Sequence, residues 1–356
     1  MLSISGGWML MALNEIKKHL QGYFSDGLVT IVGSGLSCAE GLPSMGEVAD
    51  HLCDTIGAGL DAADQAGWAE TIPLIKAKGL EYALQERVPT PTLELAITNA
   101  TASMIADRER QVITSVFNSE RQLRLTRLLG HMLKPSFGLP IVTTNYDRLV
   151  EVAVEEAGIG ADTMFVGRFA GSLNERESKL SFCHNVTYKK PKVTLHYRPR
   201  ALIYKPHGSI DWYLRGDKPV FYAGDLPDAR RLIITPGQNK FRNGYESPFD
   251  HHRARANDAI DRASRFLILG YGFNDDHLET HLSTVIKGGM PALILSRTLT
   301  SNASAIALAN GNVTALERYE EGGIAGTRLI FNKTRSFLPG LALWDVNLFI
   351  DEVLEP

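Results

Sequence analysis

Cysteine is scarce in this sequence. Its 356 residues include only Cys38, Cys53 and Cys183, and none of them forms a C-x-x-C pair. A zinc site made of cysteine thiolates needs four ligands, so the chain cannot build one. A sparse, odd number of cysteines is also typical of a reducing compartment. We therefore expect a cytoplasmic protein that binds no metal.

Long apolar runs and an excess of charge are missing as well. No segment approaches the roughly 20 apolar residues of a transmembrane helix, and the amino terminus lacks the basic region of a signal peptide. Lysine and arginine number 37 against 40 aspartates and glutamates, a net charge of −3. This balance gives no global electrostatic reason to expect binding to a membrane or directly to nucleic acid.

Short apolar runs that end in glycine or polar residues are the clearest pattern that is present. We expect strands at residues 28–35, 139–145, 201–208, 231–237, 265–272 and 291–298, with 327–331 as a possible seventh. Helical patterns follow most of these runs. Buried strands that alternate with helices indicate an α/β fold with a doubly wound, mostly parallel, Rossmann-like sheet.

Residues 55–135 interrupt this alternation, because they hold helical patterns but no convincing strand. We expect a helical insertion subdomain there, with residues 1–54 and 136–356 forming the Rossmann-like core. Residues 162–200 are polar and in places basic. The sequence leaves open whether they form a β-hairpin or a mobile loop.

Two glycine turns follow strands of the expected sheet. In "TIVGSGLSCAEGLPS", Gly33 and Gly35 lack a Cβ, so backbone N–H groups of the turn can approach an anionic pyrophosphate. The G-x-G-x-x-G motif is incomplete, because Cys38 stands at its third glycine. A turn without a ligand is an equally good interpretation of this segment taken alone.

The second turn, "LGYGFNDDHL", begins after residue 268. Asp275 or Asp276 can cap the helix that follows, which favours a purely structural role for these carboxylates. Two such turns in one parallel sheet favour a binding site for a dinucleotide between them. Ser296 and Arg297, at the end of the next strand, can reach a ribose or an adenine, but they can equally be solvated loop residues.

An amide and an imidazole follow two further strands: Asn145 in "TTNYD" and His207 in "YKPHGSIDW". Each alone would be a structural or solvent-facing residue. Gly33, Asn145, His207 and Gly270 all follow apolar strands, however, so we expect them on one rim of the sheet. An Asn can orient a ribose or a water, and a His can accept a proton near neutral pH, which suits cleavage of the nicotinamide–ribose bond of NAD. No Tyr-Lys spacing supports hydride transfer instead.

These motifs, in this order, resemble the sirtuin superfamily. "GSGLSCAEGLPS", "TTNYD" and "KPHGSIDW" are similar to that family's G-A-G-x-S with G-x-P-S/T, its T-Q-N-x-D and its H-G motifs, with Thr144 in the place of the glutamine. The resemblance spans about residues 28 to 300 without the helical insertion. It implies an NAD-binding core and catalytic roles for Asn145 and His207. The remaining positions expected to bind NAD+ are Gly33, Ser34, Gly35, Ser37, Pro43, Ser44, Thr144, Asp147, Gly270, Tyr271, Gly272, Ser296 and Arg297.

The chain departs from sirtuin deacylases, which carry a four-cysteine zinc ribbon after the His-Gly motif. It looks more like the sirtuin-like NAD-hydrolysing subunits of bacterial anti-phage defence systems. That resemblance implies an NAD+ glycohydrolase that releases nicotinamide and ADP-ribose and depletes NAD+ in an infected cell. An NAD-dependent protein deacylase and a non-catalytic nucleotide-sensing subunit stay open as alternatives.

Such an enzyme would harm its host unless it were regulated. The chain is too short for a full sensor domain beside its core, so we expect a separate partner. The resemblance implies a HerA-type hexameric ATPase rather than a short Argonaute. We also expect a homo-oligomer that uses the helices of residues 55–135, because residues 92–117 carry more apolar side chains than a small appendage can bury. Packing of this face onto the chain's own core is the alternative.

Overall fold

A nine-stranded sheet forms the centre of the computed structural model, which describes residues 6–57, 59–226, 229–235 and 246–356. Its strand order is β16-β15-β14-β13-β12-β1-β2-β8-β3. The strands are β1 (Leu28–Val32), β2 (Leu139–Thr143), β3 (Gly160–Asp162), β8 (Arg200–Tyr204), β12 (Arg265–Leu269), β13 (Ala292–Ser296), β14 (Val313–Glu321), β15 (Ile324–Phe331) and β16 (Thr334–Pro339). Every neighbouring pair from β14 to β3 is parallel, and β15 and β16 extend that edge antiparallel. The predicted mostly parallel sheet is confirmed.

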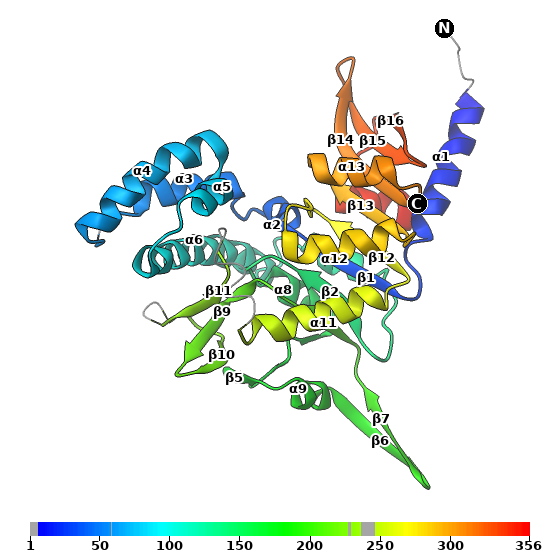
Figure 1. Cartoon of the computed structure of the whole chain (residues 1–356). Helices are drawn as coiled ribbons and strands as arrows, with labels where there is room; N and C mark the ends of the chain where they lie inside the picture. Colours follow the sequence, from blue (N-terminus) through cyan, green and yellow to red (C-terminus); the bar gives the residue numbers. More distant parts are fainter. Residues whose placement is uncertain (1–5, 58, 227–228, 236–245) are drawn as a thin grey trace.

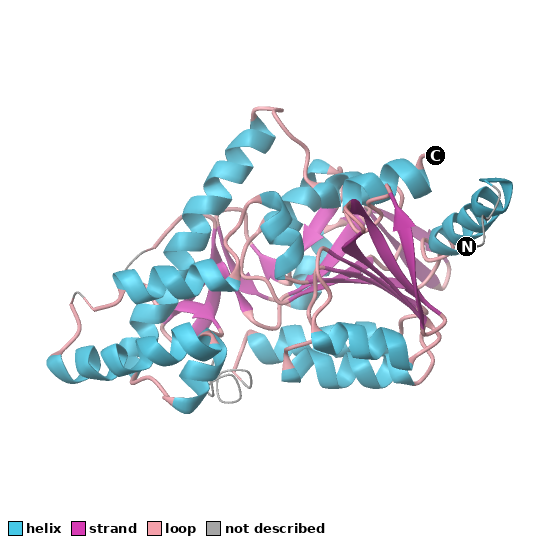
Figure 2. Ribbon diagram, turned by 90° about the horizontal axis from the view of Figure 1, so that it is seen from above, coloured by secondary structure: helices cyan, strands magenta, loops and turns pink. Residues whose placement is uncertain are grey.

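Helices lie on both faces of this sheet (Figure 2). One face packs against α11 (Phe249–Asp261), α12 (Asp276–Lys287) and α13 (Ser301–Ala309). The other packs against α1 (Gly6–Gln21), α7 (Arg124–Leu129), α8 (Leu149–Glu156), α14 (Val346–Phe349) and the π-helical turn Ile350–Leu354. The strands are therefore buried on both sides, which explains their continuous apolar runs. None of the described helices is long and apolar enough to cross a membrane.

The predicted strand at 231–237 was assigned to the wrong sheet. β11 (Arg231–Ile233) pairs antiparallel with β9 (Gly208–Arg215) in a second sheet. The order of that sheet is β11-β9-β10-β5-β4, with β10 (Lys218–Tyr222), β5 (Ala170–Leu173) and β4 (Phe165–Val166). A short buried apolar run has the same composition in a parallel or an antiparallel pairing. The sequence alone therefore could not show which sheet this strand joins. Residues 236 and 237 lie outside the described residues.

Part of the segment 162–200 forms a β-hairpin, one of the two alternatives that the sequence left open. After α9 (Glu175–Ser181), β6 (Cys183–Lys189) and β7 (Lys192–Tyr197) pair antiparallel. The hairpin projects away from the rest of the molecule (Figure 1).

Between β1 and β2, the described residues form helices and no strand: α2 (Ser34–Glu40), α3 (Met45–Thr55), α4 (Ala62–Lys78), α5 (Leu80–Glu86), α6 (Pro91–Phe117) and α7. Helices α3 to α6 share a small core around Leu52, Trp68 and Ile97, on the side of the molecule away from β14 to β16 (Figure 1). The second half of α6 joins the main core through Ile105 and Val112. The chain itself thus buries much of the apolar face of α6, so the composition of α6 no longer favours an oligomer. The homo-oligomer stays a prediction.

Candidate active site

One cavity of about 980 Å³ lies at the carboxyl ends of the central strands. Strands β12, β1, β2 and β8 are neighbours in the sheet, and Gly270, Gly33, Asn145 and His207 follow them by one to three residues. The volume is in the range of ligand-binding sites. The predicted residues that line the cavity are Ser34, Gly35, Ser37, Pro43, Ser44, Thr144, Asn145, Asp147, His207, Gly270, Tyr271, Gly272, Ser296 and Arg297. Gly33 lies just outside this lining.

Two hydrogen bonds hold the side-chain amide of Asn145. Its Nδ2 donates to the carbonyl oxygen of Gly33 at 3.0 Å and to Oγ of Ser37 at 2.8 Å. Because a carbonyl can only accept, the contact with Gly33 fixes which end of the amide is the NH₂ group. The Oδ1 atom of Asn145 is therefore the acceptor that a ligand hydroxyl or a water can use.

Asp147 extends this network behind the cavity. Its Oδ2 accepts from Ser37 Oγ at 2.8 Å and its Oδ1 from the amide of Leu149 at 3.1 Å, at the start of α8. The ammonium group of Lys205, which is fully buried, donates to the carbonyl oxygen of Asp147 at 2.5 Å and lies 3.0 Å from a carboxylate oxygen of Glu151. The loop after β2 is therefore anchored to both neighbouring loops of the sheet.

The two glycine turns pack against each other, backbone to backbone. The amide of Gly33 donates to the carbonyl oxygen of Leu269 at 2.9 Å, and the amide of Gly35 donates to that of Gly270 at 3.0 Å. A Cβ on Gly33 would lie 2.4 Å from the carbonyl oxygen of Gly270. Gly270 has a φ of +59°, and a Cβ there would lie 2.5 Å from the amide nitrogen of Leu36. This close packing requires glycine at these positions. The amides of Gly33 and Gly35, which we expected to be available for a pyrophosphate, are therefore already hydrogen-bonded.

His207 lies beside a carboxylate that sequence reasoning did not place in the site. Its Nε2 is 2.7 Å from Oδ2 of Asp275, and both residues are only 7% exposed. Asp275 was interpreted as a helix cap because it directly precedes α12. The loop after β8 is sharp: Gly208 has a φ of +86°, and its amide donates to the carbonyl oxygen of Lys205 at 3.0 Å. This tight turn directs the imidazole into the cavity.

Two arginines form a cationic side of the cavity. Arg297 follows β13 and Arg318 lies on β14, and both are exposed. Neither guanidinium has a hydrogen-bond or ion-pair partner within the described ranges. Arg318 was missed because the sequence did not reveal β14. The hydroxyl of Ser296 donates to the carbonyl oxygen of Thr298 at 2.8 Å, so this side chain is already engaged.

Helices α5 and α6 form another wall of the cavity. They contribute Glu81 of α5 and Thr101 of α6, and no sequence pattern predicted either residue for the site. The side chain of Ser44 caps α3 and exchanges hydrogen bonds with Glu47, so its role is at least partly structural. Cys38 also lines the cavity, and burial, reinforced by Glu47 and Asp147, raises the pKa of its thiol. A neutral thiol is a poor nucleophile, which argues against covalent catalysis by Cys38.

Tyr146, which is partly buried, lies between Asn145 and Asp147. Its hydroxyl donates to the carbonyl oxygen of Ile234 at 2.5 Å, and its own carbonyl oxygen accepts from the amide of Ile210 at 3.0 Å. Burial, followed by the charges of Asp275 and Glu81, raises the pKa of the phenol. Tyr146 therefore stays protonated and joins the loop after β2 to the second sheet.

Across the described residues, no group of three or more His, Cys, Asp or Glu side chains is placed to hold a metal ion.

Comparisons with known proteins identify one related family. Residues 140–314 match the family model of the SIR2-like domain. No curated protein matches the chain. Among solved structures, a Sir2 homologue in complex with ADP-ribose is similar, with 14% identity, 80% of this chain and 87% of that chain covered, and a TM-score of 0.42. A sirtuin whose structure concerns substrate affinity is also similar. Its sequence is 12% identical, the match covers 84% of this chain and 90% of that chain, and the TM-score is 0.37.

The matched segment begins in β2 and ends in β14. It contains Asn145, His207 and Asp275, while the turn at Gly33 precedes it. The solved structures are too distant for their sites to be carried over to this chain. The chain thus contains a segment that is similar to the SIR2-like domain.

Proposed function

We propose that this protein is an NAD+ glycohydrolase that releases nicotinamide and ADP-ribose. The observation that carries the proposal is the joint position of Asn145 and His207. They follow adjacent parallel strands and line one cavity, with the amide of Asn145 oriented so that its Oδ1 is available. The similarity of residues 140–314 to the SIR2-like domain supports NAD-dependent chemistry of the sirtuin kind.

The cavity suits a dinucleotide in size and charge. Its volume of about 980 Å³ lies at the upper end of the usual range for ligand sites. Arg297 and Arg318 offer two guanidinium groups that no described residue pairs with, and such groups suit phosphate oxygens. Ser34 and Thr144 add small polar groups along the same cavity.

Hydrolysis breaks the bond between the nicotinamide nitrogen and the ribose carbon and forms a bond from that carbon to a water oxygen. The water loses a proton, and nicotinamide leaves as a neutral molecule. Asn145 Oδ1 is suited to orient the water or a ribose hydroxyl, because its own NH₂ group is held by Gly33 and Ser37. The imidazole of His207 accepts the proton. Asp275 keeps that imidazole in place.

The deacylase alternative receives less support. A deacylase of this superfamily needs a site for an acylated peptide beside the NAD site, and the sequence lacks the cysteines of the ribbon that accompanies it. A nucleotide sensor has no need for an imidazole held by a buried carboxylate in its binding cavity. The hydrolase accounts for both the amide and the imidazole.

The biological role that we propose is defence against phage through depletion of cytoplasmic NAD+. In that role a separate partner holds the enzyme inactive until infection, and a HerA-type hexameric ATPase is the partner we favour. Assembly into a homo-oligomer belongs to the same proposal. Copurification with the product of the neighbouring gene is the direct test of the partner.

The activity is tested with purified wild-type chain and the variants Asn145→Ala and His207→Ala, with and without the copurified partner. Loss of the Asn145 amide leaves two acceptors without their donor, at a cost of about 1–3 kcal/mol in the free energy of unfolding. Circular dichroism and thermal unfolding therefore accompany each assay. NAD cleavage at the wild-type rate by either folded variant would overturn the site assignment.

A further inference from the structure

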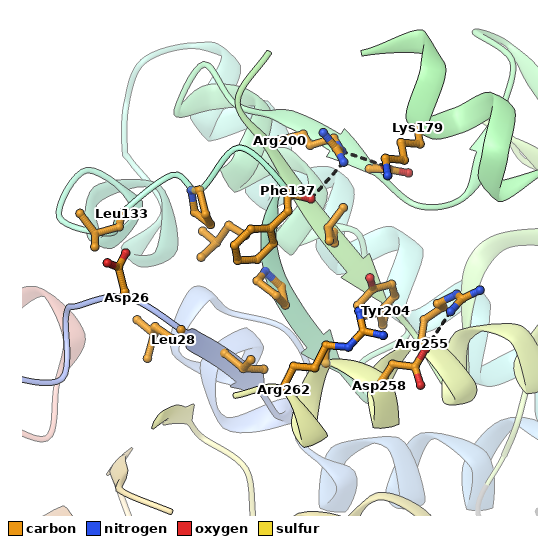
Figure 3. Close-up of a pocket in the computed structure, with 18 of the residues that line it drawn as sticks. Asp26, Leu28, Leu133, Phe137, Lys179, Arg200, Tyr204, Arg255, Asp258 and Arg262 are labelled. Carbon is orange, nitrogen blue, oxygen red and sulfur yellow. Dashed lines mark hydrogen bonds and ion pairs between the residues drawn. The ribbon is translucent and has the colours of Figure 1, made fainter. Parts of the chain in front are cut away.

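A second cavity, of about 450 Å³, lies at the opposite ends of the same strands. Leu28, which begins β1, lines it (Figure 3), and so does Leu139, which begins β2. Its remaining walls come from β8, α9 and α11, from residues 25–27 and 133–137, and from Asp162 and Met164. The cavity is thus separate from the one that holds Asn145 and His207, and the proposed hydrolysis does not use it.

Apolar side chains dominate the strand and loop sides of this cavity. Leu202 and Tyr204 lie two residues apart on β8, so they face the same side of the sheet. Phe137 and Leu133, from the segment before β2, are 61% and 49% exposed although they border a hollow. Large apolar side chains that stay exposed around a concave surface mark it as a binding site.

Most charged side chains in the cavity neutralise one another. Arg200, 3% exposed, lies 3.3 Å from a carboxylate oxygen of Asp162. Arg255 of α11 lies 2.9 Å from Glu175 and 2.7 Å from Asp258. These pairs leave little net charge on that part of the wall.

Two cations remain without a carboxylate partner within the described ranges: Arg262 at the end of α11 and Lys179 of α9. Figure 3 shows Lys179 beside Arg200, and Arg262 extending from α11 toward Tyr204. Buried Arg200 adds a third donor, because its Nη1 has no hydrogen-bond partner among the described residues. One lining carboxylate, Asp26, is also unpaired there, and it lies beside Leu133, away from Lys179 (Figure 3).

We propose that this cavity binds an amphipathic monoanion, a single carboxylate on an aliphatic or aromatic body. The apolar body contacts Phe137, Leu202 and their neighbours, and the carboxylate meets the unpaired cations. Because Arg200 and Arg255 already pair with Asp162, Glu175 and Asp258, few positive charges are left to balance a polyphosphate. A ligand with one charge and a large apolar surface needs no more than those few.

Tyr204 supports this assignment. Burial, followed by the charge of Asp162, raises the pKa of its phenol, so the hydroxyl stays protonated and can donate to a carboxylate. The side chains that can be changed without breaking a buried ion pair are Arg262 and Lys179, which are both exposed. Arg200 is unsuitable because its removal would leave buried Asp162 unpaired, and Arg255 is unsuitable because it pairs with two partly exposed carboxylates of the cavity wall.

The test measures binding of octanoate and of 4-phenylbutyrate to the full chain by isothermal titration calorimetry, and it does not depend on any enzymatic activity. Octanamide, which keeps the apolar body without the charge, is the ligand control. Arg168→Gln, at an exposed arginine that does not line the cavity, is the protein control. Circular dichroism checks that each variant is folded.

We expect at least one of the two anions to bind wild type and Arg168→Gln equally. Binding to the double variant Lys179→Gln/Arg262→Gln should be weaker by about tenfold or more, and octanamide should bind wild type about tenfold more weakly than octanoate. Failure of both anions to bind wild type would overturn the proposal. Equal binding of the anion to the double variant, or equal binding of octanamide, would overturn it as well.

Discussion

The imidazole of His207 and the carboxylate of Asp275 lie 2.7 Å apart, measured from Nε2 to Oδ2. The two residues follow β8 and β12, which are separated in the sheet by β1 and β2. The contact therefore spans the rim where Gly33 and Asn145 also lie. At this distance the carboxylate of Asp275 restricts the position of the imidazole.

Replacing Asp275 with Asn should lower kcat for NAD cleavage by about 10- to 100-fold and change KM little. The reason is that an amide holds the imidazole less firmly than a carboxylate does, while NAD contacts elsewhere in the cavity are untouched. Steady-state kinetics over a range of NAD concentrations measures both constants. Asp217→Asn, at an exposed carboxylate that does not line this cavity, is the control. A raised KM with unchanged kcat would show that Asp275 binds substrate rather than positions His207.

Gly270→Ala should destabilise the fold much more than Gly322→Ala. The two glycines have nearly the same φ, +59° and +60°, so the backbone strain of the substitution is matched. A Cβ at Gly270 would lie 2.5 Å from the amide nitrogen of Leu36, whereas nothing lies within 4 Å of one at Gly322. We expect Gly270→Ala to lose about 2 kcal/mol more in the free energy of urea unfolding. Equal losses would mean that the two glycine turns are not packed as described.

Arg297→Gln and Arg318→Gln should each raise KM for NAD by about tenfold, with kcat changed less than about threefold. Both guanidinium groups line the cavity and lack partners within the described residues, so they are free to bind phosphate. Arg168→Gln should leave KM unchanged. A fall in kcat without a rise in KM would place these arginines nearer to the reacting bond than we propose.

Cys38 should react slowly with iodoacetamide at pH 7, because burial raises the pKa of its thiol above the ordinary value of 9.0. Only the thiolate reacts, so the rate should keep rising as the pH passes 9. Mass spectrometry of the modified Cys38 peptide between pH 7 and 10 follows this rate. A rate that levels off below pH 8 would contradict the raised pKa.

Cys38→Ser should retain NAD cleavage within about threefold, since this thiol takes no part in our mechanism.

The sequence predicted the central strands well, because strands buried on both faces are continuous apolar runs. β14 was missed for the opposite reason: its last five residues, "ERYEE", are polar, and the last four of them are not buried. Because β14 was not predicted, Arg318 was not predicted to line the cavity. Prediction of the rim succeeded because the carboxyl ends of adjacent parallel strands must meet at one edge.

Asp275 shows where local patterns stop being informative. An Asp directly before a helix is a normal capping residue, and nothing nearby in the sequence connects it with His207, 68 positions away. The contacts of Glu81 and Thr101 with the cavity depend on how the small helices pack over the sheet. The mutual packing of the two glycine turns is likewise a property of the tertiary structure, although each turn was visible in the sequence.

Release of nicotinamide from NAD+ in the absence of any acylated peptide is the measurement that tests the central claim most directly. Purified wild-type chain, alone and with its copurified partner, is incubated with NAD+, and nicotinamide and ADP-ribose are quantified by chromatography. We predict equimolar release of the two products, reduced by about 100-fold or more in Asn145→Ala and His207→Ala. Nicotinamide release that requires an acylated peptide, or release by Asn145→Ala at the wild-type rate, would contradict the account.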